Sequence, residues 1–230
     1  MAVLDFHILC QAILYFCAFI AGFAISIPVG VNRINFNGQC VLYADFNWKN
    51  ATNFVMTGSS ATNCNFPIYF SVFGLIFYGL ATGLYNSYAV IRSMKDPDIG
   101  SQMWVMPFIL VNTLLAFTTL IVGCVLSVGF LQFCNGLTKT TVPSCRALEN
   151  KTWKNLAKDK PFNSGPYFKL LTVAQVAAWG CVLVFILQIV LSVLRFIRNR
   201  RRRSAQMFDS AQKAQTSSDT TKIAELEPTA

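Results

Sequence analysis

The sequence predicts an all-α membrane protein, a four-transmembrane-helix bundle with two disulfide-closed extracellular loops. Hydrophobic residues make up 54% of the 230 residues and charged residues 13%, whereas soluble domains carry about 25% charged residues. Two stretches of 25 residues, 8–32 and 170–194, carry no Asp, Glu, Lys, Arg or His. About 20 apolar residues, each rising about 1.5 Å, cross a hydrocarbon core of about 30 Å, so both stretches are long enough to span a membrane.

Four spans are expected, separated by polar segments. They are residues 8–28, 68–91, 104–132 and 170–194. Pro28 and Gly30 are expected to end the first span, which is longer than the apolar core of a signal peptide and follows no Lys or Arg, so we expect it to be retained. Residues 1–203 then form the transmembrane domain. Residues 204–230 have few apolar side chains, which predicts a disordered cytosolic tail.

An even number of spans places both termini on one side and the two long loops, 31–67 and 134–169, on the other. Lys and Arg are almost equally divided between the sides, so their number alone does not decide the orientation. An arginine cluster directly after the last span favours cytosolic termini. The N-glycosylation sequons at Asn50 and Asn150 both fall in the long loops and favour the same orientation, in the plasma membrane or the secretory pathway.

The eight cysteines divide evenly between spans and loops. Each long loop holds two, and the loop cysteines are Cys40, Cys64, Cys134 and Cys145. Two per loop, with none in the tail, predicts two disulfides formed in an oxidising compartment. Pairing within each loop needs no assumption about how the loops meet, and cross-loop pairing is the alternative.

The basic cluster after the fourth span has several interpretations. Its members are Arg195, Arg198, Arg200, Arg201, Arg202 and Arg203. They suit an anionic inner leaflet, and a plain stop-transfer flank accounts for them equally. Ser204 follows four arginines and is a candidate phosphorylation site, where phosphate would weaken lipid attraction. Membrane topology accounts for the net charge of +9 better than nucleic-acid binding does.

Small residues recur at a spacing of four in the first two spans. Gly79 and Gly83 form a G-x-x-x-G pattern, and Ala18 and Gly22 are spaced in the same way. Such spacing puts small residues on one helix face and lets two backbones approach closely. Packing within the bundle is the expected role, and a docking face for a partner protein is the alternative.

Little in the sequence points to catalysis. Five amide side chains fall in the spans: Gln11, Asn86, Asn112, Gln175 and Gln188. They predict interhelical hydrogen bonds, with an amide-lined permeation path as the alternative. His7 is the sole histidine, and nucleotide-binding, zinc-protease and hydrolase motifs are missing, so we expect no enzyme, no metal site and no cofactor.

Short motifs in both loops and the fourth span resemble the transmembrane protein 179 family of four-span proteins. They are FNGQCVL at 36–42, SVGF at 127–130, TVPSC at 141–145, and Asn163-Ser164, Ala174-Gln175 and Trp179 further on. The resemblance covers about residues 8–195 and implies a multi-pass membrane protein, with no activity attached. Claudin-like proteins show a G-L-W motif before paired cysteines. Trp48 stands alone between Cys40 and Cys64, so we expect no close claudin kinship.

The expected function is that of a non-catalytic accessory or scaffold subunit for a larger membrane protein such as a channel or receptor. The expected contacts are an anionic inner leaflet and a membrane-protein partner, with no nucleic acid. A pore or transporter that uses the amide-bearing helices is one alternative. A cell-surface adhesion protein that acts through its outer loops is another.

Overall fold

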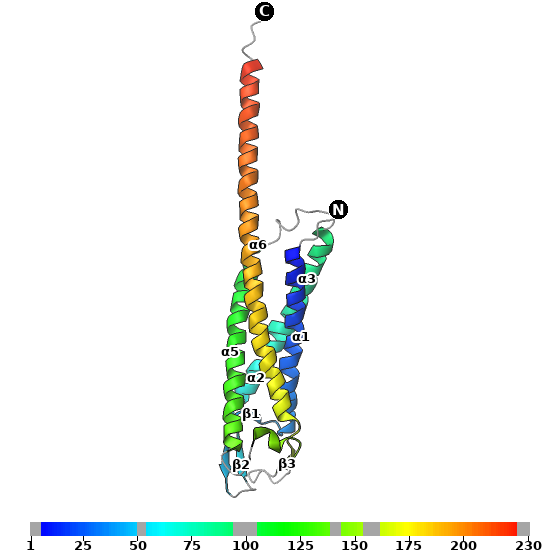
Figure 1. Cartoon of the computed structure of the whole chain (residues 1–230), viewed down its shortest axis with the longest axis vertical. Helices are drawn as coiled ribbons and strands as arrows, with labels where there is room; N and C mark the ends of the chain where they lie inside the picture. Colours follow the sequence, from blue (N-terminus) through cyan, green and yellow to red (C-terminus); the bar gives the residue numbers. More distant parts are fainter. Residues whose placement is uncertain (1–5, 50–53, 94–104, 139–143, 154–161, 225–230) are drawn as a thin grey trace, which may run out of the picture.

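The computed structural model describes residues 6–49, 54–93, 105–138, 144–153 and 162–224. Four long helices run side by side as a bundle, short strands cap one end, and the last helix projects beyond the other end (Figure 1). All four helices are long and apolar enough to cross a membrane. The predicted helical membrane fold is therefore confirmed for the described part of the chain.

Helix α1 (Phe6–Asn35) continues through Pro28, where the sequence predicted its end. Proline removes one backbone hydrogen bond, but a membrane-spanning helix tolerates this when neighbouring helices pack around it, and Pro28 is buried. The helix ends instead where Asn37 and Gly38 adopt positive φ angles of 56° and 80°. There the Gly38 amide donates to the Arg33 carbonyl, which closes the last turn.

The second span begins at residue 61, seven residues before the predicted start, and consists of three helical segments. They are α2 (Ala61–Phe70), the π-helix η1 (Ser71–Phe77) and α3 (Tyr78–Ser93). Ser60 caps α2, and its side chain accepts a hydrogen bond from the Thr62 amide. Pro67 lies inside α2 without ending it. The polar residues before Ile68 thus belong to the helix and not to the loop.

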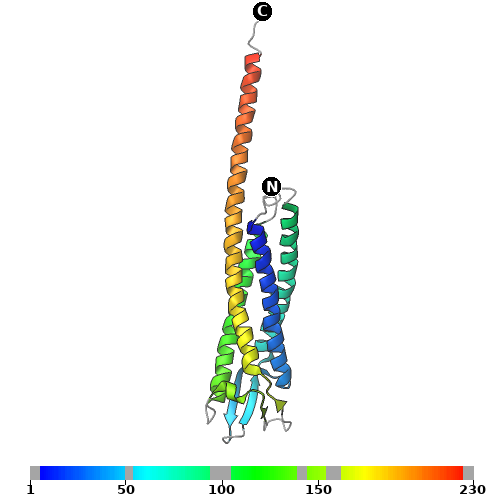
Figure 2. The ribbon, with the colours of Figure 1, turned by 45° about the vertical axis from the view of Figure 1, so that its right-hand side comes forward.

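The third and fourth spans are α5 (Met106–Leu137) and α6 (Tyr167–Ala224). Helix α6 runs well past the predicted end of its span, and Figure 2 shows it projecting beyond the other helices. The sequence predicted disorder from Ser204, but the structure continues the helix to Ala224. Residues 204–224 contain neither Gly nor Pro and include four Ala and three Gln, so no strong helix breaker interrupts α6.

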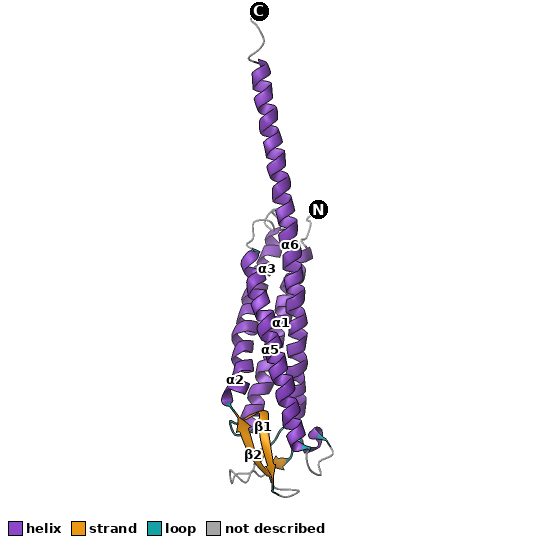
Figure 3. Ribbon diagram, turned by 90° about the vertical axis from the view of Figure 1, so that its left-hand side faces the viewer, coloured by secondary structure: helices purple, strands orange, loops and turns teal. Residues whose placement is uncertain are grey.

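Both long loops contain strands that the sequence analysis did not predict. In the first, β1 (Cys40–Trp48) pairs antiparallel with β2 (Phe54–Ser59). In the second, the 3-10 turn η2 (Cys145–Leu148) precedes β3 (Thr152–Trp153) and β4 (Phe162–Asn163), which also pair antiparallel. Figure 3 shows the first hairpin in orange at one end of the bundle. We call this end, formed by β1–β4 and η2, the strand cap.

Helix α6 packs against both α1 and α5, and α1 packs against α3 and η1. Strand β1 lies on the end of α5. Gly129 of α5 allows this contact, because a Cβ there would lie 2.9 Å from the Tyr43 ring and 3.0 Å from Leu42 Cβ. An aromatic cluster joins the cap to the helices, and the Phe133 ring lies 5.4 Å from the rings of both Phe46 and Tyr167. The cap is therefore packed onto the bundle and shares its core.

Candidate functional site

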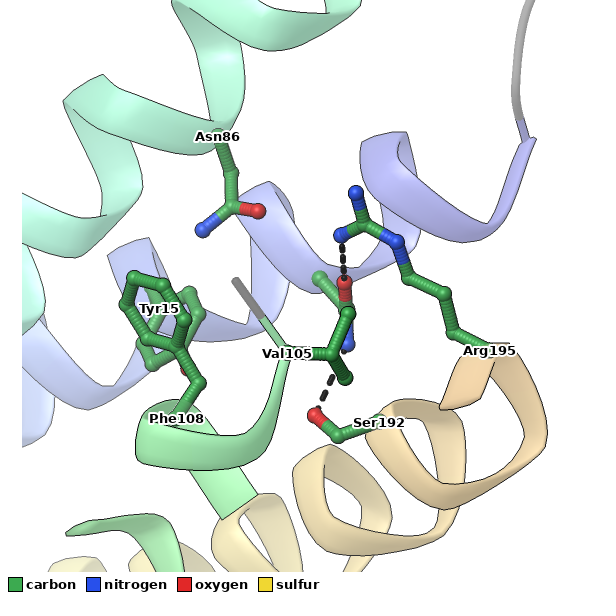
Figure 4. Close-up of a pocket in the computed structure, with 7 residues that line it drawn as sticks. Tyr15, Asn86, Val105, Phe108, Ser192 and Arg195 are labelled. Carbon is green, nitrogen blue, oxygen red and sulfur yellow. Dashed lines mark hydrogen bonds between the residues drawn. The ribbon is translucent and has the colours of Figure 1, made fainter. Parts of the chain in front are cut away.

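A cluster of polar side chains lies between the helices at the end of the bundle opposite the strand cap. Gln11 of α1 is its centre and contacts Ser192 and Arg195 of α6, two residues that Figure 4 labels at one side of the cluster. Gln11 Nε2 donates to Ser192 Oγ over 3.0 Å, and Arg195 Nη1 donates to Gln11 Oε1 over 3.2 Å. Gln188 Nε2 donates to the Gln11 carbonyl over 2.8 Å. One glutamine thus receives or makes three hydrogen bonds with α6.

A second group of hydrogen bonds joins α1, α3 and α5. Asn112 Nδ2 donates to the Tyr15 hydroxyl over 2.7 Å, and the Tyr78 hydroxyl donates to Asn112 Oδ1 over 3.2 Å. The Tyr15 and Tyr78 rings meet edge to face at 5.9 Å. Asn112 is fully buried, so its amide holds three helices together where no water competes.

Between these side chains remains a cavity of about 10 Å³, roughly the space that one water molecule needs. It is lined by Gln11, Tyr15, Asn86, Val105, Phe108, Ser192 and Arg195 (Figure 4). Asn86 donates to the Thr82 carbonyl of its own helix over 2.8 Å. The cavity can hold a bridging water, but the hydrogen bonds around it make the cluster a clamp between helices.

Three of the five predicted span amides form hydrogen bonds between helices, in two groups, and a fourth, Asn86, lines the cavity beside Gln11. Gln11, Asn112 and Gln188 bond across helices, Asn86 bonds within its helix, and Gln175 lies about 20 Å along α6 from Gln188. That Tyr15, Tyr78 and Ser192 take part in these hydrogen bonds between helices was not predicted from the sequence. The spacing of 188, 192 and 195 was a usable signal, because these positions share one face of a helix.

The predicted basic cluster after the fourth span includes one residue, Arg195, that lies inside the bundle. Arg195 was predicted to contact lipid, but only 8% of its surface is exposed, and it faces Gln11 inside the bundle. It follows Ser192 by three residues and Gln188 by seven, so helical periodicity turns it to the buried face. The remaining predicted members, Arg198, Arg200, Arg201, Arg202 and Arg203, are exposed. Ser204 is also exposed, and its hydroxyl donates to the Arg200 carbonyl.

Both disulfides form within their loops. Cys40 pairs with Cys64 and joins the start of β1 to α2, and Cys134 pairs with Cys145 and joins α5 to η2. The prediction of two loop disulfides is confirmed, and the cross-loop alternative is wrong. The Trp48 indole reinforces the cap, because Nε1 donates to the Gly136 carbonyl of α5 over 3.0 Å.

The predicted small residues lie at helix contacts. A Cβ at Gly79 would lie 3.0 Å from the Tyr15 carbonyl oxygen, and one at Gly22 would lie 2.6 Å from the Ile76 side chain. Gly83 faces the Phe16 ring, and Ala18 is fully buried. Of the two sequons, Asn150 is exposed beside the cap, and Asn50 lies outside the described residues.

Comparison with known proteins places this architecture in a family. Residues 7–223 match the family model described as the transmembrane protein 179/179B claudin domain. The chain belongs to the transmembrane protein 179/179B family. Transmembrane protein 179B of Danio rerio is 25% identical over 191 residues, which cover 82% of this chain and 83% of that protein. No solved structure matches the chain.

Membership in the transmembrane protein 179/179B family confirms the resemblance found in the sequence. It also corrects the argument against claudin kinship, since the family's own description names a claudin domain. Trp48 and the cysteines on either side of it cover only part of one loop. A relationship that extends over four helices and both loops is not visible in so short a motif.

Proposed function

We propose that this chain is a non-catalytic accessory or scaffold subunit that docks a larger membrane protein, such as a channel or receptor. The observation that supports the proposal best is the bonding of the polar side chains in the bundle interior. Gln11, Asn112 and Gln188 hold helices to one another. Side chains that already form hydrogen bonds between helices stabilise a rigid bundle. They are poorly suited to replace the hydration shell of a permeating solute.

The size of the cavity in the polar cluster argues in the same direction. At about 10 Å³ it holds about one water molecule. Large apolar side chains line the outer surface of the spans, for example Phe73 of η1 and Phe117 of α5, both more than half exposed. Lipid or the helices of a partner can cover such a surface. In this role the outer surface of the helices contacts the partner protein, and the polar interior stabilises the bundle.

The orientation in the membrane is part of the proposal. We place both termini in the cytosol and the strand cap outside, in the plasma membrane or the secretory pathway. The arginines at 198 and 200–203 support this orientation, because they are exposed on α6 where it leaves the bundle. They would contact the anionic inner leaflet. The exposed Asn150 beside the cap would then be open to glycosylation.

Site-specific photocrosslinking in cells tests the docking role. A photoreactive phenylalanine analogue replaces Phe23 of α1, Phe73 of η1 or Phe117 of α5 in turn, because all three side chains are exposed. Adducts with one membrane protein from one of these faces are expected, and the other faces serve as internal controls. Absence of protein adducts at all three positions would contradict the accessory role.

A flux assay separates the accessory role from a pore. Purified full-length protein is reconstituted into liposomes, and ion and solute flux are compared with empty liposomes. We expect no flux above the empty control, because Gln11, Asn112 and Gln188 are engaged in hydrogen bonds between helices. Selective flux from the pure protein that disappears in a Gln11→Leu variant would establish the pore and overturn the proposal.

A further inference from the structure

A groove opens on the membrane-facing side of α1 near the strand cap. It has a volume of about 560 Å³ and is lined by Gly30, Arg33, Ile34, Asn37, Gly38 and Ile68. Pockets for small ligands commonly measure about 300–1,000 Å³. The lining combines apolar side chains from α1 and α2 with a single cationic side chain, Arg33.

The Arg33 guanidinium is held in place by neutral groups. Nη1 donates to Asn65 Oδ1 of α2, and Nε donates to the Gly38 carbonyl over 3.3 Å. The described residues place no carboxylate in ion-pair contact with Arg33. Its position is therefore fixed while its positive charge is left without a protein counter-ion in the described part of the chain.

The position of Arg33 along α1 places its charge at the membrane surface. Phe6 and Arg33 are separated by 27 residues, which is about 40 Å of helix and exceeds a hydrocarbon core of about 30 Å. Ile34 beside it is 77% exposed. A Cβ at Gly30, about one turn nearer the membrane centre, would have no neighbour within 4 Å. Apolar space thus lies directly below a cation at headgroup depth.

We propose that this groove binds one phospholipid from the leaflet on the side of the strand cap. The lipid phosphate is the charge complement of Arg33, since a guanidinium donates two parallel hydrogen bonds to phosphate oxygens. The start of an acyl chain lies against the bare backbone at Gly30 and against Ile34 and Ile68. The lipid then covers the seam between α1 and α2 at the base of the cap.

Photolabelling with a phospholipid tests the site. Full-length protein in nanodiscs is labelled with phosphatidylcholine that carries a diazirine in one acyl chain, and the labelled peptides are measured by mass spectrometry. Labelling of the peptide containing residues 30–38 is expected. Arg33→Gln should reduce it about tenfold, the scale of losing a charge-assisted hydrogen bond. Lys169→Gln, which removes an exposed charge at the same end of the bundle, should leave it unchanged.

A second variant separates lipid binding from folding, because Arg33→Gln also breaks the bond to Asn65. Gly30→Phe fills the groove and keeps Arg33, and it should also reduce labelling about tenfold. Its matched control is Gly180→Phe on α6, where a Cβ likewise has no neighbour within 4 Å. Labelling that survives Gly30→Phe, or that falls equally with Gly180→Phe, would overturn the proposal.

Discussion

Replacing Gly79 with alanine is expected to force α3 away from α1. The new Cβ would lie 3.0 Å from the Tyr15 carbonyl oxygen and 3.1 Å from the Phe19 amide nitrogen. Both are backbone atoms that cannot rotate aside, so the helices must separate by a few tenths of an ångström. Overpacking of this kind costs typically about 1–3 kcal/mol. The cost falls on the close contact between α1 and α3.

Gly83→Ala on the same helix is the matched control. A Cβ there would lie 3.4 Å from the nearest atoms of the Phe16 ring, an ordinary contact with a side chain that can adjust. Both substitutions exchange glycine for alanine inside one helix, so the gain in helix propensity is common to both and cancels in the comparison. The difference between the two variants therefore reports the close contact at Gly79, and it should be about 1–3 kcal/mol.

The assay is reversible unfolding of the purified protein in bicelles, with the free energy of unfolding measured by steric trapping. Gly79→Ala should be the less stable variant, while Gly83→Ala should match or slightly exceed the native protein. Equal free energies of unfolding for the two variants would contradict this expectation, and so would a Gly83→Ala protein less stable than Gly79→Ala. Either result would mean that α1 and α3 do not meet at Gly79 as closely as the structure shows.

Three further substitutions, the first with a control variant, test the polar cluster, the strand cap and the orientation. Gln11→Leu removes two interhelical side-chain bonds and should lower the free energy of unfolding by about 1 kcal/mol, whereas Gln175→Leu should have a smaller effect. Trp48→Phe keeps an aromatic ring, although a smaller one, and loses the indole hydrogen bond to the Gly136 carbonyl, whose loss should cost about 1 kcal/mol in the same assay. No loss of stability would contradict either assignment. Asn150→Gln should remove one glycosidase-sensitive band shift from protein expressed in human cells, and an unchanged pattern would show that this sequon is unused.

The positions of the spans were predictable, but several of their ends were not. A long stretch without charged residues indicates a membrane-spanning helix, because placing a charged side chain in the hydrocarbon core costs free energy. Where each helix begins and ends depends instead on capping hydrogen bonds and on packing against neighbouring helices. Helix α1 passes through Pro28, which is buried, and stops where Asn37 and Gly38 take positive φ angles. Helix α2 starts early because Ser60 caps it and the polar residues before Ile68 fit into its first turns.

The polar cluster was predictable only in part. The amides Gln11, Asn112 and Gln188 stood out because polar side chains are rare in a span. Tyr15 and Tyr78 did not, since tyrosine is common at membrane interfaces and in apolar cores. Arg195 appeared to belong to a surface cluster because five arginines follow it closely. Its burial depends on the rotation of α6 about its own axis, which packing against α1 and α5 sets.

The amino-acid sequence was sufficient to predict that the chain is a membrane protein, how many times it crosses the membrane, and that its four loop cysteines form two disulfides. These properties follow from hydrophobicity, length and cysteine placement, which act locally along the chain. The packing of the helices sets which cysteines pair, which polar side chains form hydrogen bonds with one another and which arginine lies inside the bundle. It also decided that the first loop becomes a hairpin seated on α5. Such features depend on contacts between helices that are far apart in the sequence. A pattern within one short segment carries no information about which other segment it will contact.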